Sequence, residues 1–271
     1  MTSPTLQYHQ LIFDVLGPVP PISASSLARL AAIEQQYQRA IPGALREWYA
    51  LETGYFILEH YSNGDDPVPL DAFLHPQLAW RYRLPATLLQ DNLFTIAYEN
   101  QGGALWAAHL NGAEDPPVWI AFNPAPGRLN WSRYTDRFSS FVYANVLDHW
   151  WYVNPDDPSD PVVYLSRPHV AARDSAFSHH DLDLLRQRYQ EHPQTIGFSI
   201  KYRFSRTKEQ YILITTSPTT QETTWTLFAQ TEDGLVQLAT ELMAYGKLKE
   251  HWYCPLNEAG RRVLQRLHQP V

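Results

Sequence analysis

The segment QGGALWAAHLNGAEDPPVWIAF, residues 101–122, constrains the fold of this chain more than any other. Two apolar runs flank Asn111-Gly112, a pair that readily adopts the positive φ angles of tight turns. Pro116-Pro117 stands where the second run begins, and because proline has no backbone N–H it belongs at the mouth of a strand. The pattern predicts an antiparallel hairpin, with Trp106 and Trp119 on or beside adjacent strands.

Two helices are expected before this hairpin. Residues 22–38, ISASSLARLAAIEQQYQ, repeat apolar side chains at helical spacing, and Ser23 or Ser25 can cap the start. In IPGALREWYALETGY, which follows, Pro42 suits the first helical position and Gly54 can end the helix. Helical elements therefore precede the first clear strand.

The remainder of the first half mixes a proline-rich connection, strands and a third helix. Residues 61–92 contain four prolines, so we expect an extended connection with at most one strand. The strand series begins at LFTIAYEN, residues 93–100. Residues 131–151, WSRYTDRFSSFVYANVLDHWW, place apolar side chains at helical spacing and predict a helix.

A run of proline and aspartate, NPDDPSDP, marks the predicted boundary between domains at 1–153 and 154–271. The second domain is expected to contain strands at 161–165, 196–204, 210–216 and 223–230, and helices near 178–190, 232–245 and 256–267. The fold class is therefore α+β. N-terminal helices pack on a mostly antiparallel sheet, and a second α+β region follows.

Charge is distributed unevenly along the chain. Residues 1–153 contain 8 Arg and no Lys against 14 acidic residues, whereas residues 154–271 contain 13 basic and 14 acidic residues. An acidic surface without lysine repels phosphate backbones, which argues against nucleic acid and favours a basic protein partner. The sequence shows no leader and no membrane-spanning run, so we expect a cytoplasmic protein without a membrane partner. The sequence makes no prediction of the oligomeric state.

Four stretches, taken in order, resemble the SUKH superfamily of fungal cell-wall-synthesis regulators and bacterial toxin-immunity proteins. They are the amphipathic helix at 22–38, the proline-started AIPGALREWYALETGY, the strand ending in DPPVWIAF, and the aromatic helix that begins with Phe-Ser-x-Phe. The resemblance covers roughly residues 22–150. It implies a SUKH-like α+β domain that binds proteins and has no catalytic centre. An immunity protein of this kind would neutralise a toxin by occluding it.

Three acidic residues in predicted loops of the first half are the candidate contacts for such a partner: Asp65, Asp66 and Glu114. Acidic side chains speed association with a basic surface and select against wrong partners. No Gly-rich phosphate loop, paired-cysteine zinc spacing or His-Glu-x-x-His helix occurs. We therefore predict no catalytic residue, no metal and no cofactor.

One alternative stays open at the level of sequence, namely an enzyme whose site lies in the C-terminal half. His179, Asp183 and Arg203 carry the functional groups that such a site could use. His179-His180-x-x-Asp183 also has metal-ligand chemistry, but its position at a helix start is more typical of a solvated first turn.

Overall fold

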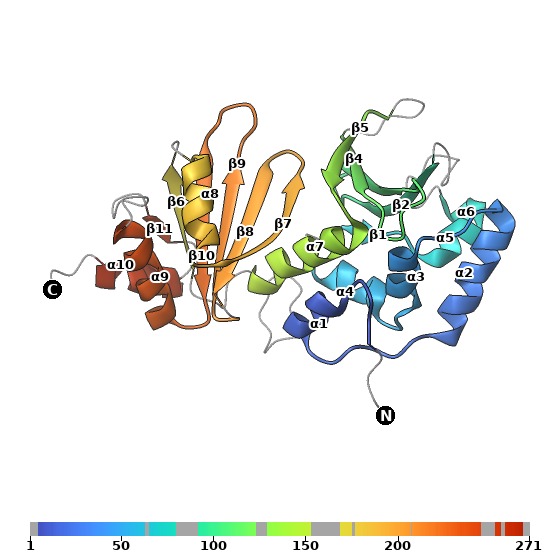
Figure 1. The fold of residues 1–271 in the computed structure, drawn as a ribbon, viewed down its shortest axis with the longest axis horizontal. Coiled ribbons are helices and arrows are strands. Elements are labelled where there is room, and N and C mark those ends of the chain that lie inside the picture. Colours follow the sequence, from blue (N-terminus) through green and yellow to red (C-terminus); the bar gives the residue numbers. More distant parts are fainter. Residues whose placement is uncertain are drawn as a thin grey trace. The chain divides into compact units, whose positions relative to one another are not determined.

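The computed structural model describes residues 5–62, 65–79, 92–122, 129–152, 169–174, 177–206, 208–244, 253–255 and 258–267. The chain divides into two compact units, Met1–Leu147 and Asp148–Val271. Each unit combines helices with an antiparallel sheet, which confirms the α+β prediction (Figure 1). The division falls within a helix, whereas the sequence predicted a boundary after residue 153.

Unit 1 contains a five-stranded antiparallel sheet in which the strands pair in chain order, β1-β2-β3-β4-β5. The strands are β1 Asp66–Pro67, β2 Leu93–Tyr98, β3 Ala104–His109, β4 Val118–Phe122 and β5 Trp131–Thr135. The helices are α1 Gln10–Leu16, α2 Ala24–Tyr37, α3 Gly43–Ala50, α4 Gly54–His60, α5 Leu70–Leu74, α6 Pro76–Ala79 and α7 Phe138–Tyr152. Only the first ten residues of α7 belong to unit 1.

The hairpin predicted from residues 101–122 is confirmed as β3 and β4. Gly112 has a φ of 90° in the turn, a value that glycine adopts without a steric penalty. Trp106 lies opposite Ile120 and Trp119 lies opposite Ala107, so the two tryptophans are on adjacent strands. Pro116-Pro117 immediately precedes β4, and the Pro117 carbonyl accepts a hydrogen bond of 2.8 Å from the N–H of His109 at the end of β3.

The first two predicted helices are also present, but one of their ends differs from the prediction. The Ser23 hydroxyl accepts a hydrogen bond of 3.2 Å from the backbone N–H of Ser26 and so caps α2. The next helix ends at Ala50, and Gly54 begins α4 instead of ending α3. A Cβ atom on Gly54 would collide with the carbonyl oxygen of Trp48, so glycine is required by the close approach of two backbones.

Two other predictions for unit 1 were wrong in part. Residues 131–135 form the edge strand β5, and the third helix begins only at Phe138. The connection at 61–92 contains the short helices α5 and α6 in addition to β1. Residues 80–91 of that connection lie outside the described residues.

One side of the unit 1 sheet is packed against helices. Phe94 of β2 stacks on Phe73 of α5 with ring centroids 4.3 Å apart, and it meets Tyr49 of α3 edge to face. Trp106 of β3 projects from the same side, since its neighbour Ala108 is the register partner of Phe94, and its ring lies 6.3 Å from that of Phe141 in α7. These aromatic contacts bury large apolar areas and hold the helices to the sheet.

Unit 2 contains a six-stranded antiparallel sheet in the order β11-β6-β10-β9-β8-β7. The strands are β6 His169–Asp174, β7 Gln190–Ile196, β8 Ile200–Arg206, β9 Gln210–Thr216, β10 Thr223–Ala229 and β11 Tyr253–Pro255, and the helices are α8 His179–Arg186, α9 Glu232–Ala244 and α10 Glu258–Leu267. The strands at 210–216 and 223–230 and all three helices were predicted. The predicted strand at 161–165 lies outside the described residues.

The segment 196–204 was predicted as one strand and instead crosses a hairpin turn. Residues Gly197–Ser199 connect β7 to β8, and Phe198 in the turn is 68% exposed. The alternation of apolar side chains continues through the turn, and for that reason periodicity alone could not show where the chain reverses.

Side chains alternate between the two faces of the unit 2 sheet. Phe204, Ile212 and Trp225 face the core that α8, α9 and α10 cover. On the opposite face, the Tyr211 ring stacks on Trp151 with centroids 5.5 Å apart and nearly parallel planes. The last residues of α7, which belong to this unit, therefore pack on the side away from α8.

Candidate functional site

Two consecutive acidic residues between β3 and β4 bind the N-termini of two helices. Oε2 of Glu114 accepts a hydrogen bond of 2.9 Å from the Gly43 N–H, and the Glu114 carbonyl accepts one of 2.9 Å from Ala44 N–H, both at the start of α3. Asp115 accepts hydrogen bonds from the backbone N–H and the hydroxyl of Ser139 at 3.0 and 2.5 Å, at the start of α7. Carboxylates are favourable here because the first N–H groups of a helix have no partners within it.

This geometry gives Glu114, one of the three predicted contacts for a partner, a role inside the chain. Its carboxylate joins the connection between β3 and β4 to α3, whereas Asp66 begins the edge strand β1 and Asp65 directly precedes it. The adjacent Pro116-Pro117 leads directly from these two attachments into β4. The segment is therefore a structural junction, and we do not include Glu114 in the candidate surface.

Asp65 and Asp66 lie where the chain leaves α4 and enters β1. Asp66 is exposed and is the register partner of Tyr98 on β2. Asp65 is half-buried, and its carbonyl accepts a hydrogen bond of 3.2 Å from the Ser62 hydroxyl. The same hydroxyl donates to the carbonyl of Glu59 at 3.0 Å, which holds the end of α4 next to the strand.

We define the α4–β1 surface as Phe56, Glu59, Asp65 and Asp66. Phe56 is 61% exposed, a high value for a large apolar side chain, and Glu59 lies one helical turn further along α4. Neither Glu59 nor Asp66 forms an ion pair with another described residue. An exposed aromatic ring thus lies on the same short segment as two exposed acids. The sequence pattern of α4 did not reveal Phe56, because exposure depends on which side of the helix is covered.

A notch adjoins this surface. Its floor is a row of register partners across three strands, Pro67 of β1, Ala97 of β2 and Trp106 of β3. A bulge between Thr95 and Ala97 brings the small side chain of Ala97 opposite Trp106. The notch is small, with room for about one water molecule, because side chains such as Trp106 and Phe141 are at most 8% exposed. Asp65 is one of its lining residues, and Leu58, Ser62, Phe141 and Asn145 complete them.

A further acidic side chain in unit 1, Glu47, which sequence analysis missed, holds the N-terminal segment. Glu47 of α3 accepts hydrogen bonds from the backbone N–H groups of Gln7, Tyr8 and His9 at 2.6 to 2.9 Å, and His9 Nδ1 lies 3.0 Å from it. Burial acts to raise the pKa of Glu47, but the hydrogen bonds from His9 and from the three N–H groups outweigh it and lower the pKa. His9 is buried against Trp48, so this cluster has a structural role.

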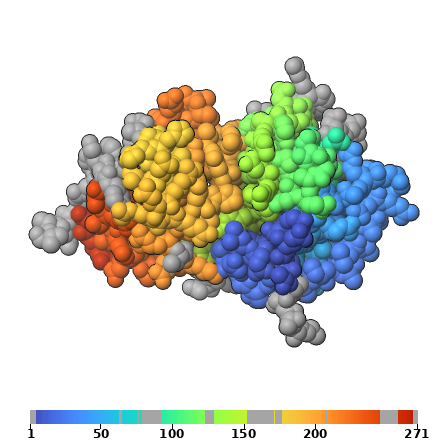
Figure 2. Space-filling view, viewed as in Figure 1, coloured from blue at the N-terminus to red at the C-terminus, as the bar shows by residue number. Residues whose placement is uncertain are grey.

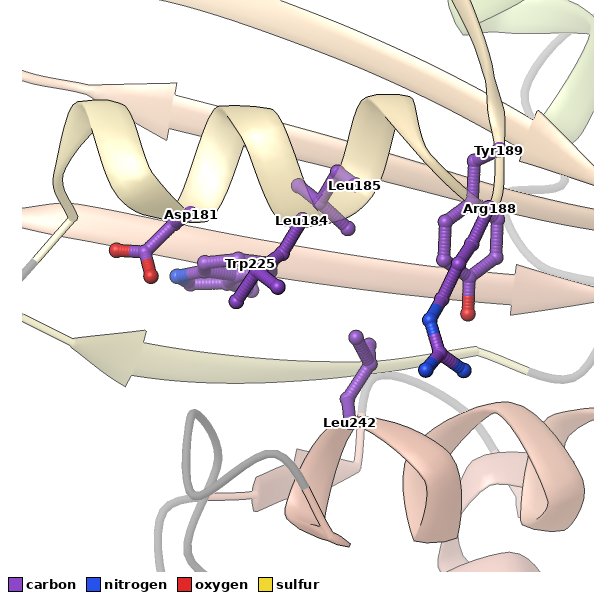
Figure 3. A pocket seen from close by; sticks show the side chains of 7 residues that line it. All are labelled: Asp181, Leu184, Leu185, Arg188, Tyr189, Trp225 and Leu242. Atoms are coloured by element: carbon purple, nitrogen blue, oxygen red, sulfur yellow. The ribbon is translucent and has the colours of Figure 1, made fainter.

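Unit 2 has a pocket of its own between α8, α9 and the sheet (Figure 3). The pocket has about 330 Å³ of space, part of it open to solvent, and its walls are mainly apolar. Asp181 and the indole nitrogen of Trp225 lie at one end, Arg188 lies at the other, and Leu242 projects between them (Figure 3).

The polar groups around this pocket already serve the fold. Asp181 Oδ2 accepts hydrogen bonds from the N–H and hydroxyl of Ser178, at 2.8 and 2.9 Å, and completes the cap of α8. Arg188 lies 3.7 Å from Glu241 of α9. Burial, assisted by the charge of Glu241, raises the pKa of Tyr189 and keeps its hydroxyl protonated. These groups stabilise the packing of α8 and α9, and none of them was a predicted site residue.

The three residues of the enzyme alternative are not brought together. His179 and Asp183 are exposed on α8, which forms part of the surface of unit 2 in yellow (Figure 2). Arg203 is 1% exposed on the opposite face of the sheet, where it binds Asp148. A sheet therefore separates Arg203 from the other two groups.

Within the described residues there is no group of three or more His, Cys, Asp and Glu side chains placed to hold a metal ion. None of the described helices combines the length and the apolar character needed to cross a bilayer. Comparison of the chain with known protein families, curated proteins and solved structures finds no match.

Proposed function

We propose that this chain is a cytoplasmic, non-enzymatic protein-binding module, and that it acts as an immunity protein that neutralises a basic toxin domain by covering it. The mechanism is occlusion, because a bound protein denies the toxin access to its target. The proposed partner is a protein, and nucleic acid and membrane lipid are not proposed partners.

The observation that carries the proposal is the α4–β1 surface. Binding energy at protein interfaces concentrates in aromatic anchors near the centre, and Phe56 with 61% exposure offers such an anchor. Acidic groups around an anchor raise the association rate with a basic partner and set its orientation. Glu59 and Asp66 supply these charges, in a unit whose basic residues include no lysine.

The enzymatic alternative has less support. His179 and Asp183 lie on one side of the unit 2 sheet, and Arg203 is bound to Asp148 on the other. The pocket of Figure 3 contains none of the three.

The proposal is tested by affinity capture with the purified chain immobilised and with matched variants beside it. Glu59→Lys/Asp66→Lys reverses two exposed charges of the surface, and Glu209→Lys/Glu222→Lys makes the same change in net charge at exposed positions of unit 2. We expect a basic protein to be retained by the wild type and the unit 2 variant and to be lost from the surface variant. Retention by all three chains would contradict the proposed surface. Conversion of a substrate by the purified chain would contradict the proposed class.

A further inference from the structure

The bend between β3 and β4 contains the pair Asn111-Gly112, and both residues are exposed. We propose that Asn111 is a site of spontaneous covalent modification, in which its side-chain amide is lost through a cyclic imide and replaced by a carboxylate. The proposal is independent of the proposed binding function, because the reaction needs only water and groups of this chain.

The backbone nitrogen of Gly112 is open to act as the nucleophile. Its N–H donates no hydrogen bond to any other residue that the structure describes. Glycine has no Cβ atom to crowd this nitrogen, and a Cβ atom built at Gly112 would meet nothing within 4 Å. There is therefore space beside Gly112 for an imide ring to close.

The side-chain amide of Asn111 is held next to the same stretch of backbone. Its Oδ1 accepts a hydrogen bond of 3.1 Å from the N–H of Ala113, two residues further along the chain. This contact turns the carboxamide toward the residues that follow it. It also draws electron density from the carboxamide carbon, which makes Cγ a better electrophile. The main-chain N–H of Asn111 donates to the carbonyl of His109 at 2.8 Å and fixes the residue at the end of β3.

The reaction balances without a cofactor. The Gly112 nitrogen attacks Cγ of Asn111, the new N–Cγ bond closes a succinimide ring, and the Cγ–Nδ2 bond breaks. Nδ2 leaves as ammonia and takes the proton that the Gly112 nitrogen gives up. Water then adds to one of the two ring carbonyls. Addition at Cγ gives aspartate, whereas addition at the main-chain carbonyl gives isoaspartate, in which the chain continues through the side chain.

The isoaspartate product affects the structural junction that follows. Its main chain is longer by one methylene group shortly before Glu114 and Asp115, whose carboxylates bind the starts of α3 and α7. Both hydrogen-bonded attachments depend on the path of this connection. We therefore expect the isoaspartate form to have a less stable unit 1 than the unmodified chain.

The test ages the purified, folded chain in a mildly alkaline buffer and maps its peptides by mass spectrometry over time. We expect aspartate and isoaspartate to accumulate at Asn111. Asn145 should keep its amide, which donates to the Phe141 carbonyl at 2.8 Å within α7. Peptide mapping also separates Asn111 from Asn63, the other asparagine that precedes a glycine.

The chain unfolded in urea gives the rate that the sequence alone allows. Since the bend leaves Gly112 open, the folded rate at Asn111 should lie within about tenfold of the unfolded rate, a difference below about 1.4 kcal/mol in activation free energy. Stronger protection of Asn111 in the folded chain would overturn the proposal. Conversion of Asn145 as fast as Asn111 would overturn it too, because the local geometry would then have no influence.

Two variants identify the reacting atoms. Gly112→Ala adds a Cβ atom beside the nitrogen, and Asn111→Gln requires a larger ring, so each should slow product formation at residue 111 by at least about tenfold. The φ of 90° at Gly112 is unfavourable for alanine, and if that variant does not fold, Asn111→Gln decides. An unchanged rate in Asn111→Gln would show that the imide route is wrong.

The effect on the junction is measured on the aged chain. An isoaspartyl methyltransferase, which labels the free α-carboxylate of isoaspartate, gives the modified fraction, and thermal unfolding gives the midpoint. Asn111→Asp is the control, since it carries the added charge on a normal main chain. We expect the midpoint to fall as the isoaspartate fraction rises and to stay nearly unchanged in Asn111→Asp. A constant midpoint in the aged chain would contradict the link to the junction.

Discussion

The carboxylate of Asp148 and the guanidinium of Arg203 form two parallel hydrogen bonds of 2.8 Å, although the two side chains are only 5% and 1% exposed. Tyr211 donates to the same carboxylate at 2.7 Å. Burial acts to raise the pKa of Asp148, but the charges of Arg203 and Lys201 and the hydrogen bonds outweigh it and hold the pKa well below its usual range. This network attaches the end of α7 to the sheet of unit 2.

Removing the cation of this pair should destabilise unit 2 strongly. Arg203→Met leaves a buried carboxylate without its main partner, and we expect a loss of about 3–5 kcal/mol in the free energy of unfolding. Arg206→Met removes a more exposed ion pair with Glu241 and should cost about 1 kcal/mol or less. Urea unfolding followed by circular dichroism makes the comparison. Similar losses in the two variants would show that Asp148 does not depend on Arg203.

His192 should make the stability of unit 2 depend on pH. Burial, together with the nearby charge of Arg203, lowers the pKa of His192 to about 4, and its Nε2 lies 2.7 Å from the Ser205 hydroxyl. Because the unfolded chain takes up the proton near its ordinary pKa of about 6.5, stability should fall as pH drops from about 6.5 to about 4, by up to about 3 kcal/mol. His192→Gln should remove most of this pH-dependent fall in stability. His179→Gln, at the exposed start of α8, should leave it unchanged. Denaturation curves at several pH values measure the effect, and identical profiles for all three chains would refute it.

Loss of the carboxylate that caps α7 should destabilise unit 1. Asp115→Ala removes both hydrogen bonds to Ser139 and should cost about 1 kcal/mol, the usual value for a helix cap. Asp136→Ala is the control, since that side chain is 83% exposed and pairs only with Arg133 among the described residues. Thermal unfolding of the two variants compares the costs. An unchanged midpoint for Asp115→Ala would show that the cap contributes nothing.

Gly54 should tolerate no side chain. In Gly54→Ala the new Cβ atom meets the Trp48 carbonyl oxygen, so α3 and α4 must move apart at a cost of more than about 1 kcal/mol. Gly103→Ala brings its Cβ only to 3.3 Å from Oε2 of Glu99, a side-chain atom that can shift more easily than a backbone carbonyl, and should cost less. Equal unfolding midpoints for the two variants would contradict the close approach at Gly54.

Local pattern was sufficient for the features of the fold that depend on neighbouring residues. The turn at Asn111-Gly112 and the Ser23 cap are of this kind, since each is determined within a few residues. Gly54 and β5 required knowledge of contacts with other segments, because a glycine can end or begin a helix and WSRYT becomes a strand only beside β4. The acidic residues also could not be assigned from local pattern, because their roles depend on contacts with distant segments. Nothing in the sequence distinguished Glu114, which binds a helix 71 residues away, from exposed Asp66.

The most direct test of the central claim is the rate at which this chain associates with the basic protein recovered by affinity capture, measured by stopped flow over a range of salt concentrations. Exposed charges act over about 8 Å at physiological ionic strength, so the wild-type rate should fall as salt increases. Glu59→Lys/Asp66→Lys should associate more slowly at low salt and show a weaker salt dependence, while Glu209→Lys/Glu222→Lys should match the wild type. If the surface variant retains the wild-type rate and salt dependence, the α4–β1 surface does not guide binding and the account is contradicted.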